Sequence, residues 1–312
     1  MTYAFDPELA AVVPMLPDLD GADPAAMRSS LSAMIAQLPA PDLTGVHCED
    51  RLIPGGAGDP EVPVRIYRPA ERSAPAAVYS VHGGGFIAGD LETEHAGNVG
   101  LARALGVVVV AVDYRLAPET PFPGPLEDVY AGLVWMAGHA EELGVDPHRI
   151  AIHGVSAGGG LCAGLALLAR DRKGPHIAFQ FLGVPELDDR LATASMTAFT
   201  DTPLWNRPKA VASWDCYLGP GRAGSDDVSS YAAPARATDL AGLPPAYISV
   251  MQFDPLRDEG IAYAQALLAA GVTVELHLFP GTFHGSALIP DAAISQREGA
   301  EAVAVLRRAL AF

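Results

Sequence analysis

The chain has 312 residues, of which 50% are hydrophobic and 18% charged, so it is globular and long enough to bury a large core without disulfides or metals. With 37 acidic and 20 basic residues, its net charge of −17 repels phosphate backbones and anionic lipids, which argues against nucleic-acid and membrane partners. The three cysteines are an odd number and form no C-x-x-C pair, so they indicate neither a disulfide framework nor a zinc site.

The N-terminal residues show no basic-then-apolar signal pattern, and we therefore expect a cytoplasmic protein. One stretch of twenty residues, 150–169, carries no Asp, Glu, Lys or Arg. It contains five glycines together with His153 and Ser156, so we do not expect it to span a membrane.

Strand-like and helix-like patterns alternate along most of the chain. Short apolar runs bounded by glycine, proline or charge predict buried strands, and apolar residues at helical spacing predict helices. In chain order the predicted elements are a helix over 23–38, strands over 62–67, 76–81 and 107–112, a helix over 127–143, a strand over 149–153, a helix over 157–170, strands over 177–184 and 245–251, a helix over 260–270, a strand over 272–279 and a helix over 292–310. This order predicts βαβ units and an α/β fold with a mainly parallel sheet.

Residues 188–238 interrupt the alternation, because about fifty residues pass without a clear strand. A structureless loop of that length is implausible in a compact domain. We therefore expect a helical insertion over one end of the sheet, which the first forty residues could join.

A candidate nucleophile lies where a predicted strand runs directly into a predicted helix. The sequence there is Gly154-Val155-Ser156-Ala157-Gly158, which is G-x-S-x-G in the strand–turn–helix context of a nucleophile elbow. The sharp turn needs small residues two positions before and after the serine, and the helix N-terminus favours developing negative charge. The alternative is a glycine-rich turn with no catalytic use.

A second glycine-rich segment, His82-Gly83-Gly84-Gly85, follows the predicted strand over 76–81. Consecutive glycines let backbone N–H groups converge on one point, as an oxyanion hole requires, together with the N–H of the residue after the nucleophile, Ala157. The alternatives are a flexible loop or a phosphate-binding loop, but the G-x-x-x-x-G-K-[ST] pattern is absent.

Three histidines follow Ser156, and one of them is expected to act as its base. His176 begins a strand and is expected to face solvent, and His277 lies inside a strand pattern where a half-exposed histidine is ordinary. His284 comes after that strand, in a loop at the C-terminal end of the sheet, where open α/β sheets place their sites. We therefore select His284.

The acid of the triad is expected on the turn after the strand over 245–251, at Asp254. Asp258 and Glu259 fit the first turn of the next helix, where acids are common because of the helix dipole. The remaining acids of the inserted segment are interpreted as solvated; they are Asp188, Asp189, Asp226 and Asp227.

Taken together, the linked motifs resemble the hormone-sensitive-lipase-like family of α/β-hydrolases, whose bacterial members are carboxylesterases. They are His82-Gly-Gly-Gly-Phe, the segment from Asp113 to Glu119 with Phe122-Pro123 behind it, Gly154-Val-Ser-Ala-Gly-Gly, the segment from Asp254 to Gly260, and His284-Gly285. The family usually has Asp or Thr where this chain has Val155, which leaves the subfamily open.

The resemblance implies one α/β-hydrolase domain over 1–312, with a mainly parallel eight-stranded sheet and helical cap elements at 1–40 and about 188–238. It also implies that Gly84 and Gly85 are oxyanion donors beside Ala157. By the same resemblance His82 and the stretch from Asp113 to Glu119 are structural. No metal or cofactor is expected.

The resulting hypothesis is a serine carboxylesterase that hydrolyses short-chain acyl esters through Ser156, His284, Asp254 and a covalent acyl-enzyme. An amidase, lactonase or deacetylase on the same triad is the alternative, and a ligand-binding pseudo-hydrolase is a more remote one. The sequence leaves open the natural substrate, the acyl limit, the enantiopreference and the oligomeric state, for which a homodimer is one option. Five residues of the inserted segment either line the pocket or pack the cap: Phe199, Leu204, Trp205, Trp214 and Tyr217.

Overall fold

The structure is a computed structural model that describes residues 3–17 and 23–310. The predicted domain and cap ranges also include 1–2, 18–22 and 311–312, which lie outside the described residues. None of the helices in the described part of the chain is both long and apolar enough to cross a membrane.

A central sheet of eight strands has the order β1-β2-β4-β3-β5-β6-β7-β8. β1 and β4 each pair antiparallel with β2, and all other neighbouring strands are parallel. The strands are β1 (Val46–Ile53), β2 (Val62–Pro69), β3 (Ala77–Val81), β4 (Val108–Val112), β5 (Ile150–Val155), β6 (Phe179–Gly183), β7 (Ala246–Phe253) and β8 (Val274–Phe283). The expected mainly parallel, eight-stranded sheet is confirmed.

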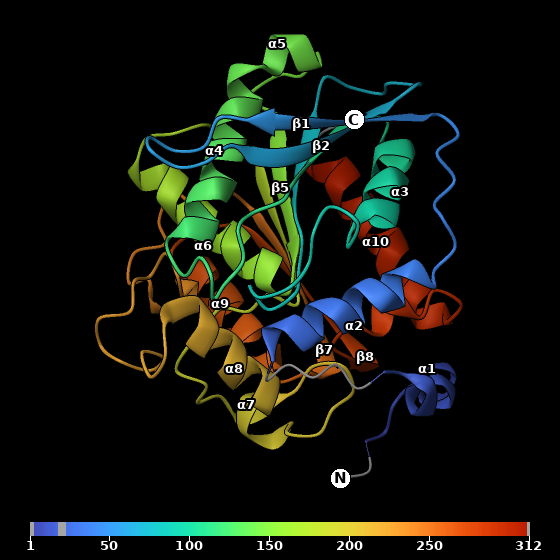
Figure 1. Ribbon diagram of the computed structural model, residues 1–312, viewed down its shortest axis with the longest axis vertical. Helices are drawn as coiled ribbons and strands as arrows, with labels where there is room; N and C mark the ends of the chain where they lie inside the picture. The colour runs from blue at the N-terminus through green and yellow to red at the C-terminus, as the bar shows by residue number, and fades with distance from the viewer. Residues whose placement is uncertain (1–2, 18–22, 311–312) are drawn as a thin grey trace.

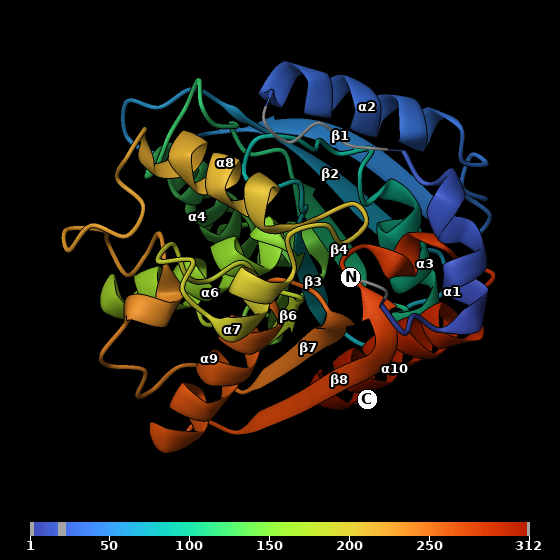
Figure 2. The same ribbon diagram turned by 90° about the horizontal axis from the view of Figure 1, so that it is seen from below.

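Helices cover both faces of this sheet and one of its ends. They are α1 (Pro7–Val12), α2 (Pro24–Ala36), α3 (His95–Leu105), α4 (Gly124–Gly138), α5 (Ala140–Leu143), α6 (Ala157–Asp171), α7 (Ala194–Ala198), α8 (Arg207–Leu218), α9 (Arg257–Ala269) and α10 (Ala293–Ala309), with short 3-10 turns at Val13–Met15, Pro234–Arg236 and Ser286–Leu288. The helices α4, α6 and α9 lie on one face, and α3 and α10 lie on the other (Figure 1). From below, α1, α2, α7 and α8 lie in front of the sheet (Figure 2).

Two elements of the fold were not predicted from the sequence. β1 is an edge strand whose buried positions are its two ends, Val46 and Ile53, so its sequence shows neither alternation nor an apolar run. α3 contains two glycines and begins without a side-chain cap, which hides its helical pattern. Propensity and periodicity fail in both places because packing against neighbouring elements decides the structure.

Two predicted elements have different boundaries in the structure. The helix predicted over 127–143 is divided at His139 into α4 and α5. The last strand continues four residues past the predicted end at Phe279, because a register shift against β7 and the left-handed Gly281 carry the chain through Pro280. As a result, β8 ends directly before His284.

The segment 188–238 contains only two α-helices among its described residues, α7 and α8, and most of the rest is turns. The expectation of a helical insertion is therefore right only in part. Buried aromatic side chains attach the segment to the domain: Trp205, Trp214 and Tyr217 are buried, and Trp214 and Tyr217 pack on Phe86. Burial of these aromatic side chains stabilises the segment, which has few regular backbone hydrogen bonds.

The interpretation of Asp188 and Asp189 as solvated is wrong. Asp189 has 1% exposure and accepts hydrogen bonds from the Arg236 guanidinium and from the backbone N–H of Gly224. Asp188 is buried and paired with Arg190. The partners of Asp189 come from distant parts of the inserted segment, which a linear sequence does not show, whereas Asp188 pairs with Arg190 two residues along the chain. Two acids later in the segment, at positions 226 and 227, are exposed as expected.

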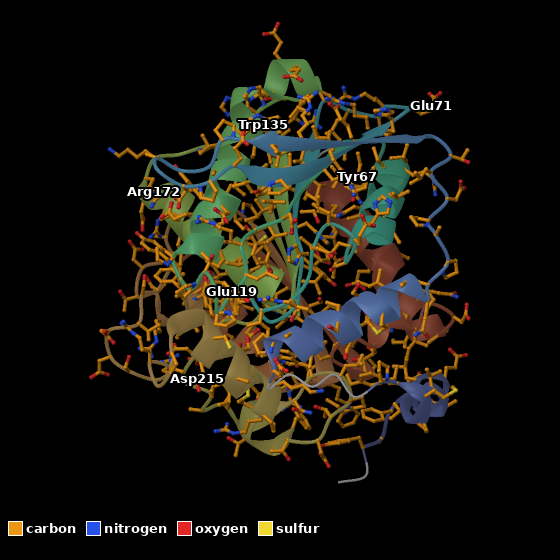
Figure 3. The ribbon with its side chains drawn as sticks, viewed as in Figure 1. Tyr67, Glu71, Glu119, Trp135, Arg172 and Asp215 are labelled. Carbon is orange, nitrogen blue, oxygen red and sulfur yellow. The ribbon has the colours of Figure 1, made fainter. Side chains whose placement is uncertain are left out.

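The helix α2 is attached to the loops at the strand ends by one arginine. The Arg28 guanidinium donates to the backbone carbonyls of Ile87 at 2.7 Å and Ala117 at 2.9 Å. It also forms a salt bridge of 2.7 Å with Glu119, which lies near the N-terminal half of α2 in Figure 3. The N-terminal helices are thereby fixed to the segment that follows β3.

The buried pair of Asp189 and Arg236 should contribute strongly to stability. Asp189→Ala leaves a guanidinium with 14% exposure without its charge partner, so we expect the free energy of unfolding to fall by about 3–5 kcal/mol. The matched control is Asp227→Ala, which breaks the exposed pair with Arg222 and should cost less than about 1 kcal/mol. Equal losses in denaturant unfolding of the two variants would contradict this account.

Candidate active site

The candidate nucleophile, Ser156, lies between the last residue of β5 and the first residue of α6. Its φ of 59° is in the left-handed region, a strained conformation for a serine that a sharp turn must hold. A Cβ on Gly154 would lie 2.2 Å from the carbonyl oxygen of Gly158, and one on Gly158 would lie 2.1 Å from that of Val81. Only glycine fits at either position, so the sharp strand–turn–helix geometry that the motif predicts is present.

The structure brings the three predicted side chains into one hydrogen-bonded series. His284 Nε2 lies 2.9 Å from Ser156 Oγ, and His284 Nδ1 lies 2.8 Å from Asp254 Oδ2. Asp254 is fully buried, and its other oxygen accepts the backbone N–H of Leu256 at 2.9 Å. Asp254, His284 and Ser156 directly follow β7, β8 and β5, so all three lie at the carboxyl edge of the parallel strands.

The rival histidines lie elsewhere. His176 is exposed, as expected, and its ring is near that of His148. His277 is half-buried within β8 and its Nδ1 contacts Glu301 of α10 at 2.5 Å. Neither histidine reaches Ser156 in the described structure.

The two other acids near Asp254, which are Asp258 and Glu259, have hydrogen-bond partners of their own. Asp258 pairs with Arg257 at 2.7 Å and accepts the N–H of Ser195 at 2.8 Å, at the start of α7. Glu259 accepts the N–H groups of Leu187 and Asp188. Both belong to the first turn of α9, as predicted.

The predicted oxyanion loop, Gly83 to Gly85, packs directly on the nucleophile elbow. A Cβ on Gly83 would lie 3.4 Å from the Cβ of Ser156, and Gly84 and Gly85 have φ angles of 117° and 59°. Within the described residues, the N–H groups of Gly84 and Gly85 donate no hydrogen bond. The N–H of Ala157 is the first of α6 and has no acceptor within that helix. Three unpaired donors therefore lie around the elbow.

The histidine before these glycines has a structural role. His82 is buried, and burial lowers its pKa to about 4, so the ring is neutral. Its Nδ1 donates to the carbonyl of Gly83 at 2.8 Å, and its ring stacks on Tyr114. Tyr114 in turn donates its hydroxyl to the carbonyl of His82 at 2.9 Å. These contacts fix the start of the loop and leave His82 outside the reacting groups, as the resemblance implies.

The five large apolar residues named above in the inserted segment divide into two groups. The ring of Trp205 lies 5.8 Å from that of His284, and Leu204 lies against Gly285, so these two contact the site. Trp214 and Tyr217 pack on Phe86, and the ring of Phe199 contacts those of Phe253 and Tyr3. The first group borders the reacting atoms and the second packs the segment.

One buried acid near the site was missed. Glu186 is fully buried two residues past Val184, at the strand edge that carries the other site residues. Burial raises its pKa to about 8, and the neighbouring Asp254 acts in the same direction. The sequence contained one signal for this site: Glu186 is an acid inside an otherwise apolar run, just after a predicted buried strand. No cluster of three His, Cys, Asp or Glu side chains in the described part of the chain could hold a metal ion.

Comparisons with known proteins identify the family of this chain. A family model described as alpha/beta hydrolase fold matches residues 78–288. Carboxylesterase NlhH of Mycobacterium tuberculosis is 42% identical over 290 residues, which cover 89% of this chain and 88% of the relative. Esterase LipI of the same organism is 38% identical, over 97% of this chain and 95% of the relative.

Among solved structures, one titled "Bacterial Heroin Esterase" is 54% identical, has a TM-score of 0.95 and covers 99% of both chains. The family model spans every residue of the candidate site, and these relatives cover most of the chain. The chain therefore belongs to the α/β-hydrolase family, among the hormone-sensitive-lipase-like carboxylic ester hydrolases.

Proposed function

We propose that this chain hydrolyses small, short-chain acyl esters with Ser156 as nucleophile, His284 as general base and Asp254 as the residue that orients the histidine. The observation that carries the proposal is the series of two hydrogen bonds, of 2.8 and 2.9 Å, that joins Asp254 to Ser156 through both nitrogens of His284. This arrangement leaves one nitrogen to take a proton while the other is held by a carboxylate.

In the proposed reaction, Ser156 Oγ attacks the ester carbonyl while His284 Nε2 takes its proton. The negative oxygen of the tetrahedral intermediate is held by the N–H groups of Gly84, Gly85 and Ala157. His284 then gives the proton to the leaving alcohol, and an acyl-enzyme remains. A water molecule, activated by the same histidine, releases the acid.

The competing functions differ from this one in what they require of the site. A pseudo-hydrolase is expected to have lost a member of the triad, whereas all three side chains are in contact here. An amidase, lactonase or deacetylase would use the same side chains, and no contact in the structure favours one of them. Ester hydrolysis agrees with the activities named for the relatives.

We also propose that the chain acts as a single α/β-hydrolase domain whose cap consists of the N-terminal helices and the segment 188–238. Contacts of both segments with the loop after β3, through Arg28 and Ser213, support this assignment. The cytoplasmic location and the homodimer stay predictions from the sequence.

Replacement of the nucleophile tests the proposal directly. Ser156→Ala should lower kcat by about 10³–10⁶-fold, because the triad acts as a unit, while far-UV circular dichroism and the unfolding midpoint stay close to those of the parent. A serine-directed phosphonate should label one residue of the parent protein and none of the variant. Retained turnover, or labelling of a different serine, would show that Ser156 is not the nucleophile.

The two neighbouring aspartates should respond differently. Asp254→Asn keeps the shape but holds His284 in the wrong tautomer, so kcat should fall about 10⁴-fold with the fold intact. Asp258→Asn removes the charge that pairs with Arg257 and leaves one acceptor oxygen where Arg257 and the N–H of Ser195 use two, so it should cost about 0.5–2 kcal/mol of stability, with turnover per folded molecule nearly unchanged. The measurements are kcat and denaturant unfolding, and reversed phenotypes would assign the catalytic role to Asp258.

The substrate class is tested with esters of graded acyl length. Trp205 and Leu204 lie against His284 and Gly285, and the −17 charge opposes work on anionic lipid surfaces. We expect kcat/KM to be highest for short acyl chains, at concentrations below their solubility limit. A sharp increase in rate that occurs only when an emulsion forms would instead identify a lipase.

A further inference from the structure

The buried Glu186 contacts the nucleophile elbow and the inserted segment at the same time. Its backbone N–H donates to the carbonyl oxygen of Ser156 at 3.2 Å, and its side-chain Oε1 lies 3.3 Å from Ser213 Oγ on α8. Its Oε2 is buried and has no hydrogen-bond partner in the described structure. A carboxyl group with so few partners is costly as an anion and is favoured as a neutral acid.

Ser213 extends this contact to the oxyanion loop. Its hydroxyl donates to the carbonyl oxygen of Gly85 at 2.7 Å. A hydroxyl has one proton, and a carbonyl can only accept, so that proton is used in the shorter bond. The longer contact is then satisfied when Glu186 carries a proton and donates it to Ser213 Oγ. The result is a chain of two hydrogen bonds, in which Glu186 donates to Ser213 and Ser213 donates to Gly85. Hydrogen bonds linked in this way polarise one another.

The oxyanion loop depends on contacts from outside to keep its conformation. Gly84, Gly85 and Phe86 all have positive φ angles, and Phe86, at 62°, is a residue that rarely adopts one. The carbonyl that Ser213 holds belongs to the peptide between Gly85 and Phe86. The bond from Ser213 fixes the plane of that peptide. The N–H of Gly85 lies in the preceding peptide, so the bond restrains the torsion angles of Gly85 and, through them, the direction of this donor.

The groups that face Glu186 oppose its ionisation. Burial raises the pKa of Glu186 most, and the charge of Asp254 raises it further. Burial also raises the pKa of Glu259 on α9, and Glu186 acts on it in the same direction. Tyr217 of α8 and Tyr114 also face it, and both phenols have raised pKa values because they are buried. The Ser213 hydroxyl can lower the pKa of Glu186 only when it turns its single proton from Gly85 to the carboxylate.

We propose that Glu186, as a neutral carboxylic acid, is a positioning residue that holds Ser213 against Gly85 and thereby fixes the backbone donors of the oxyanion hole. This inference rests on the proposed function and adds to it a requirement for one protonated acid outside the triad. Ionisation of Glu186 removes the donor to Ser213, draws the Ser213 hydroxyl away from Gly85 and so weakens the hold on the loop. Activity should therefore fall as pH rises through its pKa, which lies near 8.

The test is the pH dependence of kcat with a soluble short-chain ester, measured on the parent and on Glu186→Gln. The parent should lose turnover above about pH 8, with little change in KM, because the loop acts on the transition state. Glutamine keeps the shape and an N–H donor but cannot ionise, so kcat should stay near the parent value at pH 7 and the alkaline decline should disappear. A parent profile without this decline, or a variant that keeps it, overturns the proposal.

Two further variants separate this role from simple packing. Ser213→Ala removes the hydroxyl that links Glu186 to Gly85 and leaves the Glu186 side chain itself in place. It should lower kcat by roughly 10-fold, which is less than the 10²–10³-fold loss expected when a whole oxyanion donor is removed. It should also lose the alkaline decline, because Glu186 no longer acts on Gly85. The matched control is Glu298→Gln on α10, whose pKa burial raises to about 7, and which should leave the profile unchanged.

Failure of the proposed function would give a different result. Phosphonate labelling of Ser156 should succeed in the parent and in each of these variants, since none removes the nucleophile. If the parent is labelled at Ser156 and its kcat is flat from pH 7 to 9, only the role of Glu186 is wrong. If labelling itself fails in the parent, the assignment of the nucleophile is wrong.

Discussion

The close approach of three backbone segments around Ser156 is the constraint on which the site depends. The end of β3, the end of β5 and the first turn of α6 are so near one another that a Cβ on Gly154 or Gly158 would overlap a carbonyl oxygen. This contact forces the serine into a left-handed conformation that costs about 1–3 kcal/mol, which the surrounding sheet and helix must supply. This conformation places the Ser156 hydroxyl at the carboxyl edge of the sheet, beside the N–H groups at the N-terminus of α6.

The same sheet edge buries three acids and gives each a different environment. Asp254 is paired with His284 and with the N–H of Leu256, so its charge has partners. Glu259 accepts two backbone N–H groups yet burial still raises its pKa, and Glu186 has only a serine hydroxyl beside it. Neighbouring carboxyl groups with unequal environments can hold different protonation states at one pH, so one fold can provide both an orienting anion and a neutral acid.

The sequence was sufficient to predict which side chains come together where these side chains belong to short motifs. The elbow around Ser156, and the positions of Asp254 and His284 just after predicted strands, follow from local patterns and from chain order, and the structure brings these residues together. Features that depend on distant partners could not be predicted in this way. The burial of Asp189 requires Arg236, and the edge strand β1 is defined by its pairing with β2.

Glu186 belongs to this second class as well, since its role depends on Ser213, a residue 27 positions away, and on Gly85 beyond it. Sequence motifs identify groups that react, because their chemistry restricts the residue type at each position. Groups that act by holding a backbone carbonyl or filling a strained loop can be of several types, and only the folded contacts show them.

The oxyanion loop is held from two sides by segments that lie far from it in the sequence. Arg28 of α2 donates to the carbonyl of Ile87, and Ser213 of α8 donates to that of Gly85, only two residues earlier. The loop itself has three consecutive residues with positive φ angles, a strained conformation that contacts with the surrounding structure stabilise. Substitutions in either segment can therefore change the direction of the backbone donors without touching a substrate. Under the proposed function, the cap would thus act on the rate of the chemical step as well as on the shape of the pocket.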